Sequence, residues 1–300
     1  MNRDELIRLL KVVEEIPCKA PKGIHTFAND ERVGKIDEEI RNSNSHYKLV
    51  KGKNYYRLYA QDTLENLAEE YNDIILVSSH ADNRQEASSY DDKSDPGYLN
   101  GCFDNSSTNS VCLYLMKYEE LPRNVVFAFT ADEEDDCKGA SHVAKKLIDI
   151  CGKEKLKAIV LDDTYGFQNG VDFTIENDYI YKKNSGEEFI QKVCNVINES
   201  GYSWNFLYSD EEKDEGKVNK YVRSQTIKEY MKEGLKAYKE VKGQDETEKY
   251  AEYKISTFSM CLPCSGTSQT MHSPKGFKIR IDTVCNYTDA LGRILKAFEG

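Results

Sequence analysis

The chain has 300 residues, 39% of them hydrophobic, which is enough for one large domain with a buried core. Its formal net charge of −11 and the lack of a dense basic block argue against nucleic-acid binding through phosphate neutralisation. No apolar run reaches the roughly 18 residues of a membrane span, and the N-terminus has no signal-peptide core, so we expect a cytoplasmic protein.

The N-terminal part is predicted to contain helices and one hairpin. Helical spacing of Leu6, Leu9, Leu10 and Val13 predicts an amphipathic helix over residues 1–16, and a second helix is expected over residues 34–41. Residues 47–50 and 55–60 resemble two strands joined by a glycine-containing turn at 51–54, which indicates a β-hairpin. A short helix is expected over residues 63–70.

From residue 74 onward, strands and helices alternate. The continuous apolar run at 74–79 is typical of a strand buried on both faces. A loop at 83–101 follows, and the further expected strands are 125–130, 158–161 and 277–281. The further expected helices are 105–116, 139–150, 187–199 and 290–298. Such alternation favours an α/β fold with a parallel sheet covered by helices on both faces.

Residues 205–252 differ in being dense in lysine and glutamate. Their apolar positions fit one amphipathic helix and are Ile227, Tyr230, Met231, Leu235, Tyr238 and Val241. We therefore expect one catalytic domain over residues 1–300 with a charged helical insertion at 205–252. The insertion can be a lid, a dimer contact, or a surface helix packed on the same domain.

The nine cysteines are odd in number and scattered, so we expect mostly reduced thiols. Cys261 and Cys264 form a C-x-x-C pair. A redox or metal role would need a second such pair or a thioredoxin-like context, and neither is visible, so the pair is interpreted as structural.

Polar residues follow the expected strands at the points where those strands end. His80 and Asp82 follow 74–79, the Glu133 and Glu134 pair follows 125–130, and Asp162 follows 158–161. The carboxyl ends of strands are where open α/β sheets place their active sites. Imidazole and carboxylate groups are also good zinc ligands.

Two further residues complete the set: Asp104, ahead of an expected helix, and His272, in a Met-His-Ser-Pro turn. Each residue alone has a structural explanation. Asp104 can cap the helix, and the glutamate pair can belong to a solvated acidic turn. The chain has only five histidines, however, and two of them stand first and last in this ordered set.

The set as a whole resembles the dizinc exopeptidases. The matching motifs are His80-Ala-Asp82, Gly101-Cys-Phe-Asp104-Asn105, Phe129-Thr-Ala-Asp-Glu133-Glu134, Leu161-Asp162 and Met271-His272-Ser-Pro. The resemblance spans roughly residues 1–198 and 254–299. It implies a mixed, mostly parallel central sheet of about eight strands between helices.

The resemblance also implies two zinc ions, with Co²⁺ or Mn²⁺ as alternatives. Asp104 would bridge both ions. His80 and Asp162 would complete the ligands of one ion, and Glu134 and His272 those of the other.

The implied reaction is hydrolysis of an amide bond by a water between the two ions. Glu133 would be the general base, and Asp82 would orient His80. Asp163 or Tyr165 would be candidates to recognise a free peptide terminus.

The compact arrangement is most similar to single-domain zinc aminopeptidases, which release N-terminal amino acids from peptides. An N-acyl amino-acid deacylase, a carboxypeptidase, a one-zinc glutaminyl cyclase and a non-catalytic relative are the alternatives. Ser106-Ser-Thr-Asn109 and Lys275 depart from the family pattern, which affects the expected substrate more than metal binding. The expected partner is a peptide or N-acyl amino acid, and homo-oligomerisation stays open.

Overall fold

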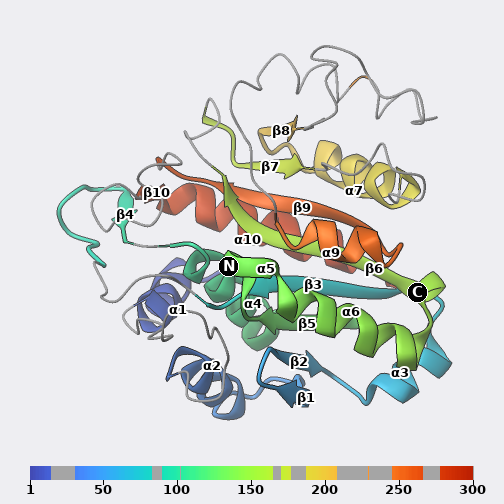
Figure 1. Cartoon of the computed structure of the whole chain (residues 1–300). Coiled ribbons are helices and arrows are strands. Elements are labelled where there is room, and N and C mark those ends of the chain that lie inside the picture. The colour runs from blue at the N-terminus through green and yellow to red at the C-terminus, as the bar shows by residue number, and fades with distance from the viewer. Residues whose placement is uncertain are drawn as a thin grey trace.

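The computed structural model describes residues 1–14, 31–82, 90–101, 103–164, 170–176, 187–207, 229, 245–265 and 278–299. These residues form an eight-stranded sheet with helices on both faces (Figure 1). The strand order is β1-β2-β5-β3-β6-β9-β7-β8. The prediction of a mixed, mostly parallel sheet between helices is confirmed.

The strands of this sheet are β1 (Lys48–Lys53), β2 (Tyr56–Ala60), β3 (Ile74–His80), β5 (Val125–Thr130), β6 (Leu156–Thr164), β7 (Phe173–Glu176), β8 (Trp204–Leu207) and β9 (Ser256–Pro263). The central strands β5, β3, β6 and β9 pair in parallel. Antiparallel pairs join β1 to β2, β2 to β5 and β7 to β9. Strands β4 (Tyr98–Asn100) and β10 (Lys278–Arg280) form a separate two-stranded sheet.

The helices pack as two layers. One layer contains α1 (Arg3–Glu14), α2 (Glu31–Arg41), α4 (Ser106–Tyr118), α7 (Glu187–Ser200) and α10 (Ile281–Lys296). The other contains α3 (Leu64–Glu70), α6 (Lys138–Cys151) and α9 (Thr247–Glu252). A short helix, α5 (Glu133–Asp136), connects β5 to α6. Two hydrophobic cores, one on each face of the sheet, result from this layering.

Most predicted elements are present, with shifted ends. The hairpin is found, but its strands extend further than expected and the turn lies at Asn54 and Tyr55. The predicted strand at 158–161 runs on to Thr164, because each added residue pairs with β9. The predicted helix at 290–298 begins at Ile281, and the strand predicted at 277–281 joins the small sheet instead of the central one.

Only the ends of the charged stretch 205–252 belong to the described residues. They contribute most of β8 and all of α9. The apolar positions on which the helix prediction depends, from Ile227 to Val241, lie outside the described residues. The helical insertion therefore stays a prediction.

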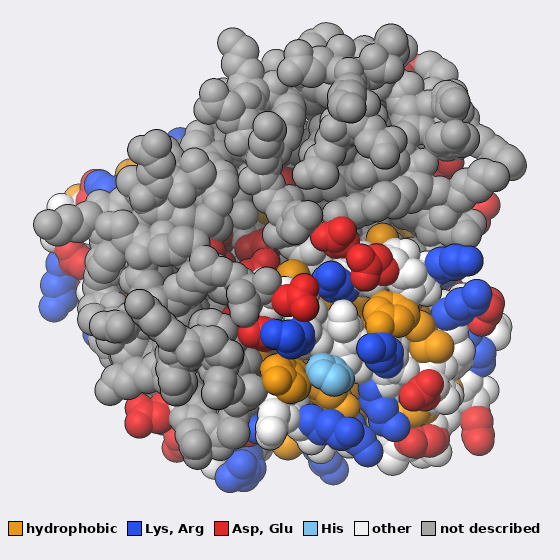
Figure 2. Space-filling view, viewed as in Figure 1, with side chains coloured by type: hydrophobic (Ala, Val, Ile, Leu, Met, Phe, Trp, Pro, Cys, Tyr) orange, Lys and Arg blue, Asp and Glu red, His pale blue; other side chains and the backbone are white. Residues whose placement is uncertain are grey.

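On the described part of one surface, acidic and basic side chains intermingle around a few hydrophobic ones (Figure 2). Within the described ranges, no helix combines the length and apolarity needed to cross a bilayer. Cys261 lies near the end of β9 and Cys264 directly after it, and both side chains are buried.

Candidate metal centre

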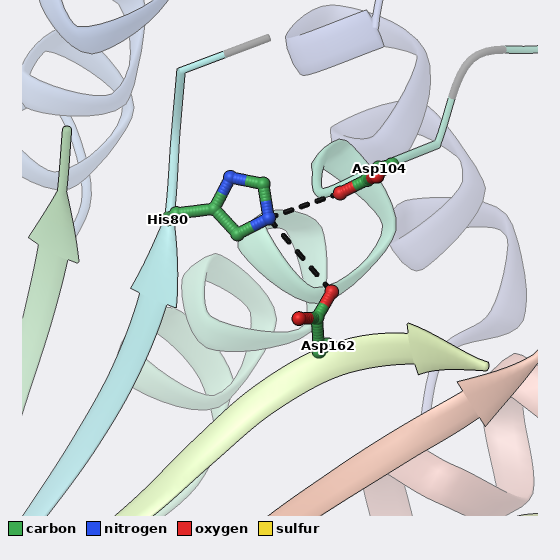
Figure 3. A group of neighbouring side chains, drawn as sticks. All are labelled: His80, Asp104 and Asp162. Atoms are coloured by element: carbon green, nitrogen blue, oxygen red, sulfur yellow. Dashed lines mark ion pairs between the residues drawn. The ribbon is translucent and has the colours of Figure 1, made fainter. Parts of the chain in front are cut away.

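His80 is the last residue of β3 and lies at the centre of a group of acidic side chains. Its ring is buried, with 2% of the side chain exposed. Its Nε2 atom lies 2.9 Å from Asp104 Oδ1 and 3.8 Å from Asp162 Oδ1 (Figure 3). The three residues come from β3, β6 and the segment before α4, so the fold brings together positions that are far apart in sequence.

The three donor atoms form a compact set. One atom from each of His80, Asp104 and Asp162 lies within 4.8 Å of the other two, and in the described part of the chain no other such group of three is found. Asp104 precedes α4, and its peptide bond to Asn105 is cis. The alternative explanation of Asp104 as the helix cap does not fit, because the N-cap position is Asn105, whose side chain makes no capping hydrogen bond.

Asp162 was predicted to follow its strand. It lies within the strand instead, opposite Cys261 of β9. Because the strand continues, Asp162 and Asp163 point to opposite faces of the sheet. Asp163 accepts hydrogen bonds from Ser107 Oγ at 3.0 and 3.2 Å. Asp163 thus connects β6 to the first turn of α4.

Asp82 lies on the other side of the His80 ring. His80 Nδ1 is 3.2 Å from the backbone oxygen of Asp82 and 3.5 Å from its Oδ1. Asp82 Oδ1 also accepts a hydrogen bond from the backbone N–H of Glu133 at 3.4 Å. The arrangement lets Asp82 fix both the imidazole and the turn that carries the glutamate pair.

The turn before Glu133 is held by an unusual backbone and an ion pair. Asp132 adopts a left-handed conformation (φ 66°), and its buried carboxylate pairs with Lys138 Nζ at 2.7 Å. Glu133 is half-buried at the start of α5, and its negative charge acts on His80. The side chain of Glu134, together with His272 and Tyr165, lies outside the described residues.

The polar start of α4, which departs from the family pattern, is completely buried. Asn105 Nδ2 donates to the backbone oxygen of Leu161 at 2.7 Å, and Asn109 Nδ2 lies 2.6 Å from the backbone oxygen of His80. Ser106 Oγ donates to Glu14 at 2.5 Å. These hydrogen bonds join the residues on both sides of the site to one helix.

Burial and neighbouring charges act in opposite directions on the site. Burial lowers the pKa of His80, but the charge of Glu133 and the carboxylates of Asp104, Asp162 and Asp82 outweigh it and raise that pKa well above its usual value. Burial raises the pKa of Asp162, the contact with His80 lowers it, and the charge of Asp104 raises it again. The carboxylates around His80 therefore favour a positive charge at this point of the structure.

These residues fit a zinc ion. His80 Nε2 is completely buried and, despite its two close carboxylates, makes no contact with hydrogen-bond geometry. A buried polar atom that lacks a partner is costly, and a cation among these atoms would bind the lone pair of this ring nitrogen. One imidazole nitrogen and two carboxylate oxygens are the donor types that zinc prefers.

A further carboxylate near the site, Glu246, was not found from the sequence. It lies just before α9 and accepts a hydrogen bond from Ser78 Oγ at 2.8 Å. Burial raises the pKa of Glu246 to about 7, while Thr130, Ser78 and the charge of His80 lower it. The sequence gave no signal, because Glu246 stands among many exposed glutamates.

A family model, described as peptidase family M28, matches residues 63–274, more than half of the chain. The chain belongs to peptidase family M28. No curated protein sequence matches it significantly. The matched range contains every predicted metal and catalytic residue of this M28 chain, from His80 to His272.

Solved structures share the fold at low sequence identity. PhTET1-12s, solved as a dodecamer, has a TM-score of 0.61 and 14% identity over 96% of this chain and 98% of its own. A Fimbriiglobus ruber glutaminyl cyclase has a TM-score of 0.58 and 11% identity, over 99% and 95%. A Staphylococcus aureus tripeptidase has a TM-score of 0.57 and 13% identity, over 99% and 98%.

The predicted resemblance to the dizinc exopeptidases is confirmed by the family match. Membership of M28 supports a zinc-dependent hydrolase of the peptidase type. The number of metal ions and the bond that is cleaved are finer questions.

Proposed function

We propose that this M28 protein is a dizinc aminopeptidase that releases N-terminal amino acids from peptides. The observation that carries the proposal is the buried group of His80, Asp104 and Asp162 at the carboxyl ends of β3 and β6. Glu133 stands beside this group, on a turn that the protein holds through Asp82.

In this proposal, five residues would hold the metal. Asp104 would contribute to both ions, His80 and Asp162 would complete the ligands of one ion, and Glu134 and His272 those of the other. The support for the first ion is the convergence of three donors from three elements. The support for the second is the order of the motifs in the sequence.

When bound, zinc polarises a carbonyl group and makes water more acidic. The proton released by this water is then transferred by a residue of the chain. Glu133 accepts it on its carboxylate and returns it to the leaving amine. The hydrogen bond from the Glu133 backbone to Asp82 and the ion pair of Asp132 with Lys138 hold that carboxylate in place.

The order and compact spacing of the motifs support an aminopeptidase over a deacylase or a carboxypeptidase, because this arrangement is most similar to that of single-domain zinc aminopeptidases.

The test combines metal content with a substrate panel. Protein reconstituted with zinc should bind two ions and hydrolyse aminoacyl anilides, while N-acyl amino acids stay intact. Release of acyl groups would make it a deacylase. Cyclisation of an N-terminal glutamine by a protein with one ion would make it a glutaminyl cyclase, the activity of one structural neighbour. Protein that binds no zinc would contradict the metal site itself.

Three organisational features belong to the same proposal: residues 1–300 form one catalytic domain, 205–252 are an insertion in it, and the protein acts in the cytoplasm. Homo-oligomerisation is supported only by the dodecameric PhTET1-12s neighbour. Light scattering of the purified chain would measure its oligomeric state.

A further inference from the structure

Glu246 is a completely enclosed carboxylate that no proposed catalytic step uses. Only 1% of the residue is exposed. Its Oε2 atom accepts a hydrogen bond from Ser78 Oγ at 2.8 Å, and the Tyr250 hydroxyl lies 2.8 Å from the same Ser78 atom. One oxygen of the carboxylate is therefore well satisfied by the protein.

The other oxygen is not satisfied. Glu246 Oε1 is buried without a hydrogen-bond partner, and so is the hydroxyl of Thr130, which lies near it without hydrogen-bond geometry. Within the described parts of the chain, no lysine or arginine forms an ion pair with Glu246. A buried carboxylate with one unsatisfied oxygen and no counter-charge is expensive to ionise, and a nearby positive charge would reduce this cost.

The position of Glu246 indicates where a compensating positive charge would lie. Its partner Ser78 is two residues before His80 on β3, so the two side chains lie on the same face of the sheet. Thr130, the other neighbour of the carboxylate, is paired with His80 across β3 and β5. Glu246 thus lies behind His80, on the protein side of the metal centre.

We propose that Glu246 is an electrostatic anchor for the bound metal: a carboxylate that does not ligate the ion but balances its positive charge from behind His80. The inference rests on the metal site of the proposed function. This role would explain why a carboxylate stands at a position where it contributes little to the stability of the metal-free protein. A negative charge that does not touch the ion still attracts it, because the protein interior screens charges only weakly.

The test is Glu246→Gln, which keeps the shape and removes the charge. At about pH 8 the carboxylate is mostly ionised, since its pKa is about 7. The zinc dissociation constant should rise by about 10- to 100-fold. The metal-free variant should melt no lower than metal-free wild type, because a buried charge has been removed. The substitution should therefore weaken zinc binding without destabilising the metal-free protein.

Two variants serve as controls. Glu252→Gln makes the same charge change on α9, at a side chain that is 52% exposed, and should leave zinc affinity unchanged. Glu246→Asp keeps the charge, but its side chain is shorter by one methylene, which weakens the hydrogen bond from Ser78. If charge is what matters, Glu246→Asp should retain zinc affinity within a few-fold of wild type.

A purely structural role gives the opposite pattern. In that case Glu246→Gln would lower the melting temperature of the metal-free protein or prevent it from folding, and either result would overturn the inference. Equal zinc affinity of wild type and Glu246→Gln would also overturn it, while leaving the proposed function intact. If wild type itself bound no zinc, the metal site of the proposed function would fail instead.

Discussion

The chemistry of the site follows from how few hydrogen-bond partners His80 has. The ring is buried against Asp104 and Asp162 on one side and Asp82 on the other. A buried histidine with a structural role alone would satisfy its ring nitrogen with a hydrogen bond to a neighbouring group. Here the Nε2 atom faces two carboxylates without hydrogen-bond geometry to either, an arrangement that a bound cation would satisfy.

Glu133→Gln is the substitution that tests the proposed general base. The amide cannot accept a proton, so turnover should fall by roughly 100- to 10,000-fold. The backbone N–H of residue 133 still donates to Asp82, so zinc content and melting temperature should stay close to wild type. Steady-state kinetics, metal analysis and thermal melting measure the three quantities.

Asp136→Asn is the matched control, because it removes a carboxylate from the same short helix at an exposed position. It should leave turnover nearly unchanged. Full activity in Glu133→Gln would show that another group takes the proton.

Most of the candidate site could be predicted at the level of single residues, because its members are polar residues at the ends of apolar runs. Glu246 could not be, since its place behind His80 depends on how a segment 168 residues away from Ser78 packs. The hydrogen bonds of Asn105 and Asn109 were equally hidden. A polar helix start looks solvent-exposed until the tertiary structure buries it.

Among the elements, the central strands were predictable and the later ones were not. Strands β3 and β5 begin with continuous apolar runs, Ile74–Val77 and Val125–Phe129, and every residue in both strands is buried. Strand β9 is just as central, but Thr257 and Ser259 interrupt its apolar pattern. The structure buries Ser259 against Thr247, with 2.6 Å between the two hydroxyls. A strand whose polar residues are satisfied by tertiary contacts gives little signal in the sequence.

The junction between β5 and α6 depends on a glycine. A Cβ atom at Gly139 would lie 2.6 Å from the backbone N and O of Ala131 and 2.7 Å from the backbone O of Tyr55. These are backbone atoms, so they can move only if the strand or the helix shifts. Ala131 is two residues before Glu133, and the close approach therefore fixes where the acidic turn begins.

Gly139→Ala should therefore destabilise the protein by about 2–3 kcal/mol, the cost of overpacking a tight contact. Urea denaturation measures the free energy of unfolding. Gly34→Ala, in the middle of α2, is the control, because a Cβ there meets nothing within 4 Å. That variant should gain up to about 1 kcal/mol from the better helix propensity of alanine. A neutral Gly139→Ala would mean that the junction is looser than its geometry indicates.

At the scale of the whole molecule, one group of ion pairs joins three helices of the same layer. Arg8 of α1 donates two hydrogen bonds to Glu39 of α2, at 3.0 and 2.9 Å. Lys117 of α4 lies 2.6 Å from the same carboxylate. Because α4 begins at the candidate metal site, this group connects the N-terminal helices to the element that positions Asp104.

The ion pairs make a prediction about acid stability. Hydrogen bonds from Arg8 lower the pKa of Glu39 from 4.5 to about 2; burial opposes this shift, and Lys117 adds to it. A carboxyl group whose pKa is lower in the folded state stabilises the protein above its unfolded pKa, and this contribution is lost as the pH falls towards the folded pKa. Glu39→Gln should therefore lower the free energy of unfolding near neutral pH, and the difference from wild type should shrink below about pH 4.5.

The size of this effect is limited by solvent. The full pKa difference would correspond to about 3 kcal/mol, but Arg8 is 42% exposed and its ion pairs are screened, so about 1 kcal/mol is expected. Urea denaturation at several pH values between neutral and about 4 measures the difference between variant and wild type. Glu38→Gln, next to Glu39 but 52% exposed, should show almost no loss at any pH. If Glu39→Gln lowered the free energy of unfolding by the same amount in acid as at neutral pH, Glu39 would act through packing and not through its charge.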